Sequence, residues 1–91
     1  MTNYEKIIDP NNLENIVISN SKGDLFEFEQ IALIPLHDIG YAIVKPLNPE
    51  LLGMEKDEPL IFKLNDEEEE IELCTDLNII SKVFEKYENN Y

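Results

Sequence analysis

The segment from Leu25 to Leu47 constrains the fold of this chain more than any other part of its 91 residues. Its first run, LFEFE, alternates apolar and acidic residues, so two phenylalanines share one face of an extended strand and two glutamates share the other. Beyond Ile31 both faces are apolar, and Pro35 removes one backbone donor. This change predicts a bulge or bend between Glu29 and Ile31 and a margin of the sheet near Pro35.

The runs on either side of this segment predict two neighbouring strands. After a tight connection at Asp38-Ile39-Gly40, the run Tyr41–Val44 is aromatic, β-branched and apolar on both faces, which is typical of a covered strand. Before the segment, Glu14–Ser19 predicts a first strand, and the polar loop Asn20–Asp24 joins it to the next. An antiparallel hairpin therefore opens the sheet.

A second hairpin is predicted further along the chain. Leu60–Leu64 alternates apolar and polar positions, and so does Glu70–Leu73. The polar connection Asn65–Glu69 has hairpin length, whereas the segment from Asn48 to Pro59, with its prolines, glycine and charges, predicts a surface loop.

The last segment changes to helical spacing. Its apolar residues fall on one stripe of an α-helix, with lysine, serine and glutamate on the other side, and either Thr75 or Asp76 can cap its start. The members of the predicted stripe are Leu77, Ile80, Val83, Phe84 and Tyr87.

Together these elements predict an α+β fold: a five-stranded antiparallel meander, made of two hairpins and a central strand, with one C-terminal amphipathic helix packed on one face. We interpret residues 1–13 as a loosely held N-terminal arm and residues 14–91 as a single domain. One helix does not cover both faces of such a sheet. Either the sheet curls on itself, or a second subunit forms a homodimer over the uncovered face; otherwise the chain is a monomer.

The charge balance excludes several classes of partner. The chain carries 20 acidic and 7 basic residues, a formal net charge of −13, and every basic residue is lysine. Direct binding of nucleic acid or of an anionic membrane requires clustered cations, so neither is expected. The single Cys74, the absence of an apolar signal-peptide core and the short apolar runs favour a cytoplasmic protein without a membrane span.

The order of these elements resembles the DUF1292 (YrzB-like) family of small acidic bacterial proteins of unknown function. The resemblance covers roughly Glu14 to Glu88. It depends on the opening hairpin, the run GYAIVKPL at Gly40–Leu47, an acidic loop, an apolar strand, a glutamate-rich turn and a closing helix that contains Val83-Phe84. It implies this architecture and no activity, cofactor or catalytic residue. The sparsely acidic arm with Ile7-Ile8 departs from the family pattern, in which an acidic tail is more usual.

The densest charge in the chain lies in and beside the second hairpin turn. Clustered carboxylates can bind a hard cation, but the spacing of a calcium loop is absent and adjacent glutamates in a strand point to opposite faces. The pattern therefore predicts a solvated turn without metal, and this turn is the candidate contact for a partner. The candidate residues are Asp66, Glu67, Glu68, Glu69, Glu70 and Glu72.

Two further residues are candidates for chemistry. His37 is the only histidine and lies beside Asp38, but no nucleophile is near it in the sequence, so a turn residue is predicted. Cys74 precedes the helix cap, yet its approach is rich in glutamate, which disfavours a thiolate and predicts a structural residue.

The sequence thus favours a non-enzymatic acidic protein, with no cofactor, that binds a basic partner protein. Two alternatives stay open. One is a mimic of nucleic acid, in which carboxylates imitate phosphates; the other is an enzyme or small-molecule binder with a pocket between the helix and the sheet.

Overall fold

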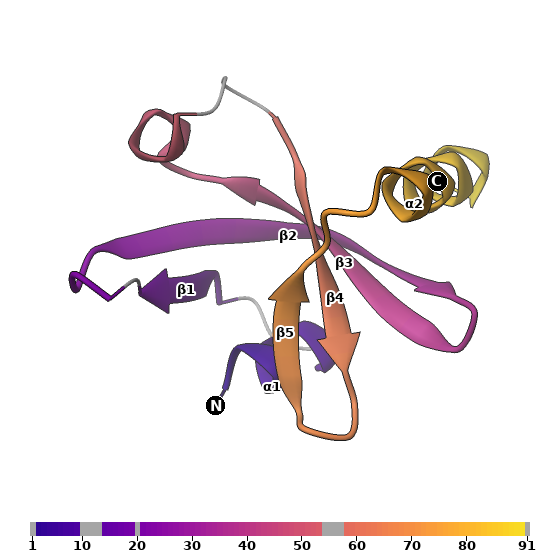
Figure 1. Cartoon of the computed structure of the whole chain (residues 1–91), viewed down its shortest axis with the longest axis horizontal. Helices are drawn as coiled ribbons and strands as arrows, with labels where there is room; N and C mark the ends of the chain where they lie inside the picture. Colours follow the sequence, from indigo (N-terminus) through magenta and orange to yellow (C-terminus); the bar gives the residue numbers. More distant parts are fainter. Residues whose placement is uncertain (1, 10–13, 20, 54–57, 91) are drawn as a thin grey trace.

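The fold is a single curled sheet of five antiparallel strands with one helix on each side (Figure 1). The computed structural model describes residues 2–9, 14–19, 21–53 and 58–90. The strands are β1 (Ile16–Ser19), β2 (Leu25–Leu36), β3 (Ile39–Pro46), β4 (Leu60–Asn65) and β5 (Glu70–Leu73), and they are neighbours in chain order. The helices are α1 (Asn3–Ile8), the 3-10 helix η1 (Pro49–Leu52) and α2 (Leu77–Asn90). The predicted α+β meander with its C-terminal helix is confirmed.

β2 contains the predicted bulge. Its register with β3 shifts between Gln30 and Ala32. Because side chains alternate along a strand, one extra residue exchanges the two faces. Phe28, before the bulge, belongs to the core on one side of the sheet, whereas Ile34, after it, belongs to the core on the other side. The bulge therefore allows one long strand to contribute to both cores.

The turn between β2 and β3 lies one residue earlier than predicted. Leu36 pairs with Ile39, and the two residues between them have positive φ, 51° at His37 and 64° at Asp38. Two such residues form the tight turn that matches the twist of a hairpin. Ile39 and Gly40, predicted to be part of the connection, instead belong to β3.

Helix α2 covers one side of the sheet, as predicted. Asp76 caps it: its carboxylate Oδ1 accepts from the backbone N–H of Asn78 at 2.9 Å and of Ile79 at 3.4 Å. Val83 is fully buried, but Leu77 is 80% exposed, so its predicted place in the buried stripe is wrong. Leu77 is the first residue of the helix, and contact with the sheet begins with Ile79. The core on this side consists of Ala32, Ile34, Tyr41, Ile43, Ile61 and Val83.

Helix α1 covers the other side, and the prediction of a loosely held arm is wrong for this helix. Ile7 is 3% exposed and belongs to a core to which each of the strands β1 to β4 contributes side chains. In Figure 1, α1 lies between β1 and β5, where the curled sheet is open. The sheet curls on itself, which confirms one of the two predicted ways of covering this face, and the chain's own N-terminal segment adds Ile7 to the core there. Residues 10–13 of the predicted arm lie outside the described residues.

Candidate functional site

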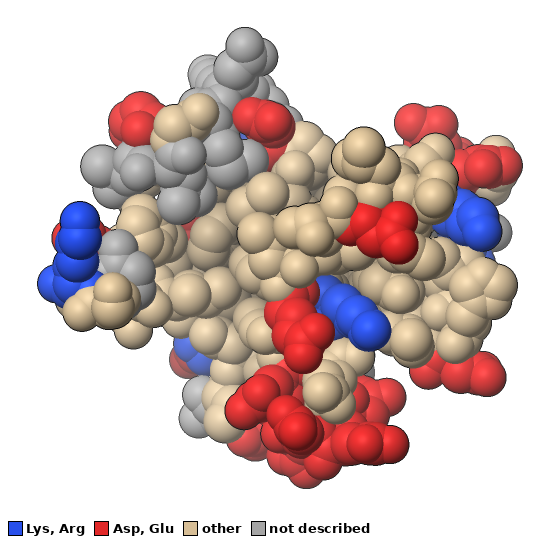
Figure 2. Space-filling view, in the orientation of Figure 1, with Lys and Arg blue, Asp and Glu red and all other residues tan. Residues whose placement is uncertain are grey.

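The β4–β5 hairpin carries all six predicted contact residues. We call Asp66–Glu70 together with Glu72 the acidic hairpin; each of its side chains is exposed. Asn65 pairs with Glu70 across the hairpin, and the four residues between them form the turn. In Figure 2 the largest group of acidic side chains gathers at the bottom, where Figure 1 shows this turn.

Two hydrogen bonds of this hairpin fix the shape of its turn. The Asn65 carboxamide oxygen accepts from the backbone N–H of Glu68 at 3.3 Å, which orders the start of the turn. Glu69 has φ 54°, so a glutamate occupies the left-handed conformation that closes the turn. The Tyr4 hydroxyl donates to Asp66 at 2.6 Å and thereby links α1 to the turn.

The negative charge of the turn affects the pKa of Tyr4. The hydrogen bond to the Asp66 carboxylate, followed by desolvation and by the negative charges of Asp66 and Glu69, raises the pKa of Tyr4 above its usual value of 10.0. Each cause favours the neutral phenol, because a phenolate would face carboxylates. The turn therefore presents a negative field that acts on a neighbouring element.

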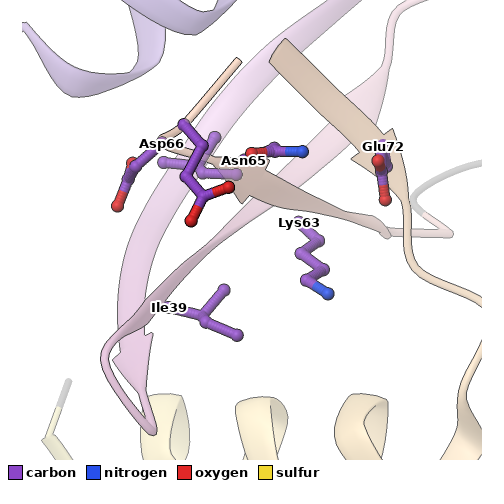
Figure 3. A pocket seen from close by; sticks show the side chains of 7 residues that line it. Ile39, Lys63, Asn65, Asp66 and Glu72 are labelled. Atoms are coloured by element: carbon purple, nitrogen blue, oxygen red, sulfur yellow. The ribbon is translucent and has the colours of Figure 1, made fainter. Parts of the chain in front are cut away.

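An open hollow of about 410 Å³ adjoins the hairpin (Figure 3). Its lining combines the apolar side chains of Ile39 and Leu64 with polar residues of the hairpin. Lys63 and Glu72 are cross-strand partners, and Figure 3 shows their side chains pointing to the same side. The lining of this hollow has one cationic side chain, Lys63, among three carboxylates, so the hollow is a polar depression of the surface.

The carboxylates of the hairpin do not converge on a metal position. Among the described residues, no three histidine, cysteine, aspartate or glutamate side chains lie close enough together to hold a metal ion. Glu70 and Glu72 lie on β5, whereas the other four residues form the turn. The arrangement suits the binding of several separate cationic groups, such as the side chains of a basic protein.

His37 and Cys74 are not members of the acidic hairpin, although Cys74 directly follows β5. His37 is exposed in the β2–β3 turn, as a turn residue should be. Cys74 is half-buried against the core beneath α2, and its backbone N–H donates to the carbonyl of Ile61 at 2.8 Å. Burial, followed by the proximity of Cys74 and Asp76, raises the pKa of Tyr41.

The interface between α2 and the sheet is apolar. Of the residues that the structure describes, no charged side chain is buried, and the buried core on this side is aliphatic apart from Tyr41. A second hollow, of about 270 Å³, is lined by Leu36 at the end of β2 and by the polar residues Lys82, Glu85, Lys86 and Asn89 of α2. There the Lys86 ammonium donates to the carbonyl of Pro35 at 2.5 Å, which fastens the helix to β2.

Comparisons with protein-family models, with curated protein sequences and with solved structures returned no match for this chain. The resemblance to the DUF1292 family therefore stays a prediction. Within the described ranges, no helix has the length and apolar character needed to cross a membrane.

Proposed function

We propose that this chain is a non-enzymatic acidic protein of the cytoplasm that binds a basic partner protein through the acidic hairpin. One observation supports this proposal above the others: six exposed carboxylates gather on a single hairpin whose turn is held in shape. A concentrated field of one sign speeds the encounter with a surface of opposite sign and selects against partners of like charge.

The support beneath the hairpin favours recognition by a fixed surface. β4 is paired on both sides, with β3 and β5, and its Phe62 packs edge-to-face against Phe28 with ring centroids 5.6 Å apart. Because Tyr4 holds the Asp66 carboxylate and Asn65 holds the Glu68 amide, the backbone of the turn loses little conformational freedom on binding. A preorganised turn binds at a lower entropic cost than the same segment in a disordered tail.

The two alternatives have weaker support. A mimic of nucleic acid needs carboxylates in rows that follow a phosphate backbone, whereas the densest acids here gather at one turn. An enzyme or small-molecule binder of the predicted kind needs polar groups that converge in a pocket between the helix and the sheet, whereas the buried residues described there are aliphatic apart from Tyr41.

The test compares two variants with equal charge. In the hairpin variant, glutamine replaces each glutamate from Glu67 to Glu70; in the control, glutamine replaces four exposed glutamates elsewhere, Glu27, Glu50, Glu85 and Glu88. Both variants lose four negative charges. Immobilised wild type and variants capture proteins from lysate at low and high salt, and the association rate of each captured basic protein is then measured.

We expect the hairpin variant to associate roughly ten-fold more slowly than the control variant at low salt, with a shallower dependence on ionic strength. Equal rates for the two variants would move the contact away from the hairpin. No salt-sensitive partner for the wild type would contradict the proposed function itself.

A further inference from the structure

The two edges of the sheet are protected in different ways. An edge strand exposes backbone groups that pair with other strands unless charge or a covering element prevents it. β5 carries Glu70 and Glu72 within its four residues, whereas β1, with the sequence IVIS, has no charged side chain. β1 therefore depends on a covering element.

The register identifies which groups of β1 face the open edge. Val17 lies opposite Glu27 in β2, and the carbonyl of Glu27 accepts from the N–H of Leu47 at 2.9 Å, on the side away from β1. Val17 and Glu27 thus form a non-hydrogen-bonded pair, in which the backbone groups of each residue point away from the partner strand. The N–H and C=O of Val17 face the edge.

Side chains of α1 occupy acceptors on this edge. The Asn3 carboxamide Nδ2 donates to the carbonyl of Val17 at 2.9 Å, and the Lys6 ammonium donates to the carbonyl of Asn15 at 3.4 Å. Asn15 and Val17 are two residues apart, so their carbonyls point the same way. α1 therefore binds two acceptors that an additional strand would use.

We propose that α1 is a removable cover, and that when it leaves, β1 pairs antiparallel with β1 of a second copy of this chain. The strand is self-complementary: about a twofold axis at Val17, each Ile16 lies opposite Ile18 of the other copy. Both isoleucines face the apolar core side. The absence of charge in β1 means that no like charges meet within the paired strands.

Helix α1 is held by the burial of Ile7 and by polar contacts of single side chains, including a hydrogen bond from the Gln30 side chain to the Ile7 carbonyl at 3.4 Å and an ion pair between Lys6 and Glu14 at 3.6 Å. A helix of six residues is too short to persist by itself, so it depends on docking. Ile7 is its one buried residue, and the gap it fills lies between the first and last strands. Such an element opens at lower free energy than the sheet beneath it.

The response to salt distinguishes this interface from the acidic hairpin. Each copy carries a formal charge of −13, so self-association is opposed by repulsion that salt screens. Dimerisation through β1 should strengthen with salt, whereas binding of a basic partner should weaken. The proposal does not depend on the function assigned to the hairpin.

The test uses the full chain with Ile7→Asp, which disfavours docking of α1. Release is followed by hydrogen exchange at the Lys6 and Asp9 amides, which donate to Thr2 and Glu5 within the helix. Sedimentation over a range of concentrations gives the dimer dissociation constant. We expect a monomeric wild type and a variant whose dimer is about ten-fold tighter at 0.5 M than at 0.05 M salt, where screening lengths differ about three-fold.

A matched pair at Val17 locates the interface. Val17→Pro, added to Ile7→Asp, removes an N–H that faces the edge and leaves the ladder with β2 intact, so it should abolish the dimer. Val17→Thr keeps that N–H, so this variant should still form the dimer. Circular dichroism shows whether each variant is folded. If the Val17→Pro variant is unfolded, Val17→Lys takes its place, because it sets two like charges opposite each other in the proposed dimer.

If Ile7→Asp itself unfolds, the triple variant Asn3→Ala, Tyr4→Phe, Lys6→Met decides the question. It removes the three hydrogen bonds that side chains of α1 donate to Val17, Asp66 and Asn15, and it keeps Ile7 in place. A folded variant that stays monomeric at all concentrations overturns the proposal. So does a dimer that survives both the proline and the lysine substitutions at Val17.

Discussion

Replacement of Ile7 by alanine measures how much α1 contributes to stability. The Ile7 side chain is 3% exposed and packs in the same core as Ile16, Phe28 and Phe62. Truncation of a buried isoleucine to alanine costs about 2–5 kcal/mol, through lost burial and the cavity that remains. Since α1 lies at the margin of the core and can settle inward, we expect a loss near the lower end, about 2–3 kcal/mol.

The assay is urea unfolding followed by circular dichroism, with Ile8→Ala as the matched control. Ile8 is the next residue in the same helix but is 45% exposed, so its truncation should cost less than about 1 kcal/mol. The difference between these neighbours isolates burial from helix propensity. A loss below about 0.5 kcal/mol for Ile7→Ala, within the range of ordinary surface changes, would refute the docking of α1.

Three further predictions concern single residues. Asp76→Ala should cost about 1 kcal/mol of stability, because it removes the cap of α2, whereas Thr75→Ala should leave the melting temperature nearly unchanged. Asp38→Gly should stabilise by up to about 1 kcal/mol, since glycine adopts the positive φ of 64° without strain; a loss of stability would contradict the turn geometry. The raised pKa of Tyr41 favours the neutral phenol in the folded state, so its contribution is present below pH 10.0 and is lost as pH rises through the higher folded value. Urea midpoints should therefore fall less steeply at alkaline pH in Tyr41→Phe than in wild type, and equal slopes would count against this cause.

Most of the sheet can be predicted because its strands keep a period of two. The bulge in β2 is visible in the sequence as a break in that alternation, and the second hairpin as two alternating runs around a polar turn. The turn between β2 and β3 is harder to place. Its left-handed positions hold His37 and Asp38, while the glycine that usually marks such a turn, Gly40, lies two residues later in β3.

The docking of α1 is the main feature that sequence reasoning missed. One signal was present: Thr2 and Glu5 have the spacing of a capping box, and the structure contains both of its hydrogen bonds. A six-residue helix followed by Asp9-Pro10 nevertheless offers too short a pattern to separate from a turn. Its stability comes from the burial of Ile7 against strands far along the chain, which local patterns do not reveal.

The residues of the candidate site could be predicted from the sequence, but their contacts with other elements could not. Charge density and hairpin length identify the acidic turn directly from the sequence. The hydrogen bond between Tyr4 and Asp66 joins residues 62 positions apart, and it depends on the docking of α1. The hollow likewise depends on the register of β4 with β5, which places Glu72 opposite Lys63 in its lining.

The most direct test of the proposed function is a map of the partner contact by NMR. A basic protein captured by the wild type is titrated into isotope-labelled protein, and backbone amide shifts are recorded at about 0.05 M and about 0.5 M salt. We predict that the largest changes fall at Asp66–Glu72 and decline at the higher salt concentration. Changes concentrated in α2 or β1, with the hairpin amides unmoved, would contradict the proposed contact surface.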